Sequence, residues 1–91
     1  MPSLHMEVDV SRSVVERISQ CESDIQTAIG KINTGVLILG QSWYGSSTDE
    51  FLSTYNQWHL KALRMLEELQ NLKNDLEKEI DNWEELASKL A

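Results

Sequence analysis

Apolar residues recur along two long stretches of this chain at alternating steps of four and three residues. The first stretch runs from Val14 to Leu39, and the second runs from Phe51 to Leu90 with Glu79 as its single polar member. A 3.5-residue repeat of this kind is typical of α-helices that pack lengthwise against each other at small crossing angles. The pattern therefore predicts two long amphipathic helices.

Glycine marks the break between the two stretches. All four glycines lie between residues 30 and 45, and no glycine or proline follows Gly45, so nothing interrupts a helix from there to the end of the chain. A chain that reverses at Gly45 would bring the two helices together antiparallel. The expected fold is all-α, a helix-turn-helix hairpin formed by the single domain 1–91.

Polar residues at the ends of the stretches predict where the helices begin and end. Asp9 is suited to cap the first helix, and Gly40 can end it in the left-handed conformation that glycine adopts easily. Ser47 and Glu50 have the spacing of a capping box at the start of the second helix. We expect helices over about 9–40 and 48–90, joined by a turn over about 41–47.

The apolar stripe is wider than one hairpin can bury. Three positions per seven-residue repeat are mostly apolar, a pattern that favours a helix with two helical neighbours. A small hairpin supplies only one neighbour and little core. The sequence therefore predicts that two hairpins dimerise into a four-helix bundle. The residues expected in the hairpin seam or the dimer interface are Ile18, Cys21, Ile25, Ile32, Phe51, Tyr55, Trp58, Met65, Leu69 and Leu72.

Charge narrows the range of partners. The chain has 15 acidic and 8 basic residues, a formal net charge of −7. This balance argues against nucleic acid, whose phosphates need Lys and Arg, and against an anionic membrane surface. The longest aliphatic run, Val36 to Leu39, is far too short to span a bilayer, so we expect no stable membrane insertion. The N-terminus lacks the basic and apolar regions of a cleavable signal peptide.

Few residues of the chain are candidates for catalysis or metal binding. Cys21 falls on the apolar stripe, where a small buried hydrophobe is the expected role. His5 and His59 have no further ligands at the spacing that a metal site requires. The acidic pairs of the second helix lie on its outer surface and share no cleft, as general acid–base catalysis would need. We expect no catalytic residues, no cofactor and no metal, and therefore no enzyme.

The tripeptide Trp43-Tyr44-Gly45 stands at the joint between the helices. Gly45 allows the chain to reverse, but a simple hairpin turn needs no tryptophan. Trp43 either caps the end of the bundle core or is presented at the tip for recognition by a partner. The two roles are compatible, since a ring can pack on one side and expose the other. We take Trp43, Tyr44 and Gly45 as the candidate recognition motif.

A Trp-x-Gly turn between two matched amphipathic helices, in an acidic chain of this length, resembles the WXG family of small type VII secretion substrates, the ESAT-like proteins. The resemblance extends over the whole chain. The small and polar residues that precede Phe51, and Trp58 on the same face, are also similar to the family pattern. One feature differs: the family's C-terminal signal of Tyr, three residues and an acid is missing, and Trp83 is followed four residues later by Ala87.

The resemblance implies a helical hairpin that dimerises antiparallel, often as a homodimer. It also implies a bacterial protein, cytoplasmic before export and secreted without a cleavable signal peptide, with a type VII (Esx) secretion ATPase or a cargo protein as partner. Such proteins are non-enzymatic effectors or adaptors. Two alternatives remain open at this stage: a cytoplasmic helical chaperone or adaptor for another secreted helical protein, and a heterodimer subunit whose mate supplies the export signal.

Overall fold

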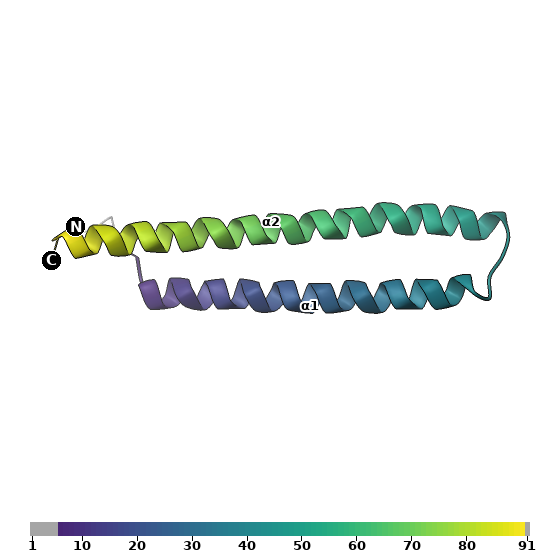
Figure 1. Ribbon diagram of the computed structural model, residues 1–91, viewed down its shortest axis with the longest axis horizontal. Helices are drawn as coiled ribbons and strands as arrows, with labels where there is room; N and C mark the ends of the chain where they lie inside the picture. The colour runs from purple at the N-terminus through teal and green to yellow at the C-terminus, as the bar shows by residue number, and fades with distance from the viewer. Residues whose placement is uncertain (1–5, 91) are drawn as a thin grey trace.

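The computed structural model describes residues 6–90 and contains two antiparallel helices, α1 (Val8–Gly40) and α2 (Ser46–Leu90). The predicted all-α hairpin is confirmed. Helix α1 lies alongside α2 over its whole length, and a short turn joins the two helices at one end (Figure 1). The Cα atoms span 69 × 19 × 17 Å, so the hairpin is a narrow rod. The longer helix α2 extends past α1 at both ends (Figure 1).

The seam between the helices uses two of the three apolar positions in each repeat. On α2 these positions recur at steps of four and three residues and are buried or half-buried. They are Leu52, Tyr55, His59, Ala62, Leu66, Leu69, Lys73, Leu76, Ile80 and Trp83. The matching half-buried or buried residues of α1 are Val8, Ser11, Val15, Ile18, Glu22, Ile25, Ile29, Asn33 and Val36. The hairpin therefore buries one side of each apolar stripe and leaves the rest uncovered.

The apolar core of a single hairpin is small. Within the described part of the chain, Ile29, Ala62 and Ile80 are the buried hydrophobic residues. A helix pair has no third layer to cover it, so most seam residues stay half-exposed along their outer edges. Apolar burial is the main stabilising term in folding. A core this small leaves a large part of the apolar surface of the hairpin exposed to solvent.

Polar contacts across the seam fix how the helices are aligned. Near the open end, the guanidinium of Arg12 pairs with the carboxylate of Glu84. Further along, Lys73 Nζ lies 2.9 Å from Glu22 Oε1, with both side chains largely shielded from solvent. Near the turn, the hydroxyl of Tyr55 donates to Asn33 Oδ1 at 2.9 Å. A polar pair that must meet inside a seam opposes any sliding of one helix past the other.

The helix ends differ from three sequence expectations. Helix α1 begins at Val8 with Glu7 as its N-cap residue, so Asp9 lies in the first turn and is not the cap. Gly40 is the last helical residue and has no positive φ, because the helix closes through Gln41, whose amide donates to the Ile38 carbonyl, and Ser42, whose amide donates to the Leu39 carbonyl. The capping box predicted from Ser47 and Glu50 is wrong as well, because Ser47 lies inside α2.

Helix α2 begins at Ser46, one residue before Ser47, and the turn residue Gly45 accepts two amides of its first turn. The Gly45 carbonyl accepts the amides of Thr48 at 3.2 Å and Asp49 at 3.4 Å. Gly45 has φ +123°, the single positive φ among the described residues. An L-residue rarely adopts this conformation, whereas glycine does so without steric cost. The reversal predicted at Gly45 therefore takes place there.

Candidate functional site: the turn and an exposed apolar face

The turn combines a packed tryptophan with an exposed tyrosine. Trp43 is half-buried, and its ring centroid lies 5.5 Å from that of Phe51 in a tilted arrangement. Tyr44 is 80% exposed, and its hydroxyl donates to the Gln41 carbonyl at 2.7 Å. Trp43 therefore links the turn to the first turns of α2, while Tyr44 is exposed at the tip of the rod.

A row of large apolar side chains runs along the uncovered side of α2. Its members are Phe51, Trp58, Met65 and Leu72, spaced seven residues apart, with 36%, 41%, 46% and 58% of each residue exposed. Glu79 occupies the next position, and Leu86 continues the row. Seven residues are close to two helical turns, so these side chains lie on one face. Exposed aromatic and aliphatic side chains in such a line are typical of an interaction surface.

The neighbouring positions of α1 are mostly small. Val14, Cys21, Ala28 and Gly35 are spaced seven residues apart and are all exposed. Beyond its own stretch of helix backbone, nothing lies within 4 Å of the place where a Cβ of residue 35 would be, so nothing in the hairpin explains why glycine stands there. We call the two rows together the apolar face. It comprises Val14, Cys21, Ala28 and Gly35 of α1, and Phe51, Trp58, Met65, Leu72 and Leu86 of α2.

Two shallow grooves lie on the side of the rod that carries the α2 row. Helical periodicity places the α1 row on the same side, since Gly35 falls between the groove residues Ile32 and Val36 in the sequence. Near the turn, a groove with almost purely apolar walls lies between the helices, lined by Ile32, Val36, Phe51, Thr54, Tyr55 and Trp58. At the open end, a second groove is lined by Met6, Glu79, Asn82, Trp83 and Leu86. The first groove is aromatic: the rings of Tyr55 and Trp58 stack with centroids 5.9 Å apart.

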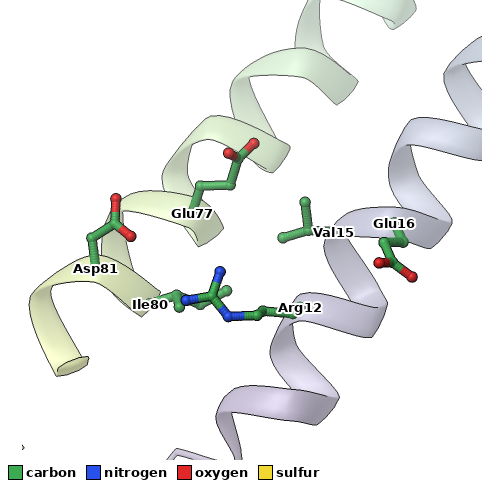
Figure 2. Close-up of a pocket in the computed structure, with 6 residues that line it drawn as sticks. All are labelled: Arg12, Val15, Glu16, Glu77, Ile80 and Asp81. Atoms are coloured by element: carbon green, nitrogen blue, oxygen red, sulfur yellow. The ribbon is translucent and has the colours of Figure 1, made fainter.

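The opposite side of the rod is polar. A groove there is lined by Arg12, Val15, Glu16, Glu77, Ile80 and Asp81, with the Arg12 side chain reaching from α1 towards α2 (Figure 2). Ile80 lies between the helices beneath these groups and is 1% exposed. We call this side the polar face. The hairpin therefore has one face with rows of exposed apolar side chains and one face lined by charged side chains.

The candidate interface residues divide between the seam and the apolar face. Inside the seam are Ile18, Ile25, Tyr55 and Leu69, all half-buried. On the exposed side are Cys21, Ile32, Phe51, Trp58, Met65 and Leu72. Cys21 is therefore exposed in the hairpin, although burial was expected. Glu22 and Lys73 also lie in the seam. They were not among the predicted interface residues, because charged residues are not expected inside an apolar stripe.

The described residues offer little else that could bind or react. No group of His, Cys, Asp or Glu side chains among residues 6–90 is arranged to hold a metal ion. His59 contacts Tyr55, with their rings 5.7 Å apart, and His5 lies outside the described residues. Neither described helix has a segment long and apolar enough to cross a membrane. The turn and the apolar face remain the two candidate sites.

The comparison with known proteins agrees with this architecture. Residues 3–88 match the WXG100 family, described as proteins of 100 residues with WXG. The chain therefore belongs to this family of small, secreted, non-enzymatic helical proteins, which are similar to type VII secretion substrates. The tripeptide Trp43-Tyr44-Gly45 supplies the motif that gives the family its name. No curated protein and no solved structure matched the chain.

Proposed function

We propose that this protein is a secreted substrate or adaptor of a type VII (Esx) secretion system and acts as a dimer of helical hairpins. The observation that carries the proposal is the uncovered apolar face, in particular the row Phe51, Trp58, Met65 and Leu72. A single hairpin exposes this row to water at a cost of about 25 cal/mol per Å² of apolar surface. A partner hairpin of the same family would cover it.

The turn is the proposed contact for the export machinery. Trp43 packs against Phe51 on one side, which holds the tip in a defined shape, and Tyr44 projects next to it. Large aromatic side chains with one fixed and one exposed side are suited to a protein partner. We propose a type VII secretion ATPase or a cargo protein as that partner, with Trp43, Tyr44 and Gly45 as the recognised residues.

A secretion assay with a Trp43 variant tests this role. The chain is expressed in a bacterium with a type VII ATPase and in the same strain without that ATPase. Export should require the ATPase, and Trp43→Ala should reduce the exported fraction while the helical circular dichroism signal stays near that of the wild type. The matched control is Trp83→Ala at the open end of α2, a half-buried tryptophan far from the turn.

The outcomes separate the alternatives. Accumulation of the wild-type protein in the cell, bound to a secreted helical partner, would assign it the role of a chaperone or adaptor. Export that requires co-expression of a second hairpin in a one-to-one complex would assign it the role of a heterodimer subunit. Loss of helicity in Trp43→Ala would mean that the ring is a core residue, and the recognition role of the turn would be wrong.

A further inference from the structure

We propose that this hairpin has a second docking surface, which binds an amphipathic helix of another protein with acidic residues beside its apolar stripe. The surface lies on the turn half of the polar face, on the opposite side of the rod from the apolar face. We call it the leucine patch, and it consists of Leu37 and Gly30 of α1 and Leu60 and Leu63 of α2. The proposal goes beyond the proposed function, because it concerns a surface that the proposed hairpin dimer leaves free.

Helical periodicity places these residues on the same side of the rod as the charged groove. That groove is lined by Glu16 of α1 and by Glu77 and Asp81 of α2. The seam repeats every seven residues along the hairpin, so steps of seven keep a residue on one side of it. Towards the turn, such steps lead from Glu16 to Gly30 and Leu37, from Glu77 to Leu63, and from Asp81 to Leu60. The charged side chains of the open half therefore give way to leucines.

The members of the patch also lie within a short length of the rod. The seam pair Glu22–Lys73, whose Oε1 and Nζ atoms are 2.9 Å apart, marks one level on both helices. Counted from this level towards the turn, Gly30 and Leu37 are 8 and 15 residues away, and Leu63 and Leu60 are 10 and 13. At about 1.5 Å per residue, the patch extends over roughly 10 Å, or two turns of helix. The two helices therefore present one compact surface.

The leucines of the patch are largely exposed to solvent. Leu37 and Leu60 are each 63% exposed, and Leu63 is 45% exposed. At Gly30, nearly level with Leu63, nothing beyond the glycine's own stretch of helix backbone lies within 4 Å of the place where a Cβ would be. Single exposed leucines are common on protein surfaces, whereas a contiguous group of them is typical of a docking site. A partner helix can therefore approach closely at Gly30 and pack on the leucines.

Basic side chains border the leucine patch. Lys31, Lys61 and Arg64 each directly follow a member of the patch in the sequence, and all three are exposed. None of them forms an ion pair with another described residue. The whole chain has a formal net charge of −7, so this basic border is a local feature of the turn half. It attracts opposite charges on a partner. The leucine patch therefore fits a helix that carries acidic residues beside its apolar stripe.

A second copy of this chain is a poor match for the leucine patch. At the same positions of its open half, the polar face carries Glu16, Glu77 and Asp81 instead of leucines. Two leucine patches placed face to face would bring the basic borders of both copies together, and like charges repel at short range. Towards the open end the patch stops at Glu67, one turn beyond Leu63 on α2. A helix of a different protein, with leucine and glutamate side by side, would avoid both conflicts.

A fluorescent peptide tests the leucine patch. The probe is a synthetic amphipathic helix of about 18 residues, with leucine at roughly three positions in seven and glutamate on both flanks of that stripe. Fluorescence anisotropy measures its binding to the full chain. Leu63→Ser should raise the dissociation constant on the order of tenfold, because the patch loses apolar contact area. The matched control is Leu86→Ser on the apolar face, where the leucine is 46% exposed and the change should leave probe binding as it is.

The flanking charges of the probe test the class of partner. A second probe, with lysine in place of every glutamate, should bind on the order of tenfold more weakly, because the basic border repels it. The net charge of −7 favours the opposite order, so weaker binding of the lysine probe would be specific to the patch. Arg64→Glu should weaken binding of the glutamate probe and improve that of the lysine probe. The control is Lys78→Glu, the same change of charge at an exposed position of the open half.

Amide chemical shifts of the isotopically labelled full chain locate the bound probe. The largest changes are expected near Leu37, Leu60 and Leu63. Changes centred on Phe51 and Trp58 would place the probe on the apolar face and overturn the proposal.

The other contrary results are equally specific. Unchanged affinity in Leu63→Ser would overturn the leucine patch, and tighter binding of the lysine probe would overturn an acidic partner. Binding of anionic lipid vesicles in place of the glutamate probe would assign the patch to a membrane surface. An assembly larger than a dimer that Leu63→Ser abolishes would assign it to a second copy. The mass of the dimer and ATPase-dependent export are measured separately, so failure of the patch would leave the proposed function standing.

Discussion

Gly45 and Gly30 differ in what the backbone requires of them. Gly45 has φ +123° at the start of α2, where its carbonyl also holds the first amides of the helix. Gly30 lies inside α1 with open space around the position of a Cβ. The first glycine permits the turn, whereas the second only weakens a helix.

Alanine substitution should therefore act in opposite directions at the two glycines. Gly45→Ala forces an L-residue into a positive φ and should lower the free energy of unfolding by about 1–2 kcal/mol. Gly30→Ala should raise it by up to ~1 kcal/mol through helix propensity. Urea denaturation at a fixed protein concentration, followed by circular dichroism, measures both. Equal effects of the two changes would contradict a specific need for glycine at the turn.

Tyr55 joins the polar and apolar contacts of the seam. Its hydroxyl donates to Asn33 Oδ1 at 2.9 Å, and its ring stacks on Trp58. Tyr55→Phe should lower the free energy of unfolding by about 1 kcal/mol, because the partly buried Asn33 amide loses its partner. The control is Tyr44→Phe, which removes a hydroxyl bonded at the exposed turn. A change of a few tenths of a kcal/mol is expected there in the same denaturation experiment.

At the scale of the elements, the Glu22–Lys73 pair decides how α1 and α2 face each other. The side chains are 15% and 20% exposed, so each charge depends on the other for much of its solvation. Removing one charge from such a pair leaves the other without a counter-ion, whereas removing both avoids that cost.

Substitution of Lys73 alone should therefore destabilise the protein more than substitution of both residues. Lys73→Met should lower the free energy of unfolding by about 2 kcal/mol, since Glu22 is left unpaired in the seam. Adding Glu22→Leu should recover that loss or exceed it, because an apolar pair fills the same space. Thermal unfolding gives the order of the three proteins. A double variant less stable than Lys73→Met would mean that the seam cannot accept an apolar pair here.

The sequence was sufficient to predict two helices, their direction and the position of the reversal. The seven-residue repeat could not show which part of the stripe each helix turns inwards. Leu66 and Met65 are equally apolar, yet Leu66 is half-buried in the seam and Met65 is 46% exposed. The difference comes from how each helix is rotated about its axis. That rotation depends on contacts between residues far apart in the chain, such as Glu22 with Lys73, which no local pattern records.

At the scale of the whole molecule, the two faces of the rod differ in chemistry, although single residues on them can be equally apolar and equally exposed. Leu63 is 45% exposed and Met65 is 46% exposed, but Met65 belongs to the row of the apolar face. Leu63 lies two positions away on α2 and is not in that row. Exposure by itself therefore does not distinguish a residue of the proposed interface, whereas membership of the row on the apolar face does.

Aspartate at these two positions should separate assembly from folding. Met65→Asp should abolish the dimer at micromolar concentration, because an unpaired charge would be buried in the proposed interface. Leu63→Asp should leave the dimer intact, and both variants should stay helical. Light scattering coupled to size-exclusion chromatography gives the masses. Equal loss of the dimer in both variants would place the contact elsewhere.

The start of α1 and the end of α2 lie together at one end of the rod, opposite the turn (Figure 1). A force that pulls the two ends of the helices apart therefore breaks the contacts between α1 and α2 one after another, starting from the open end of the rod. The pair Arg12–Glu84 would part first, then Glu22–Lys73, and Tyr55 with Asn33 near the end. Such a molecule yields to a small, steady force and closes again by the same route in reverse.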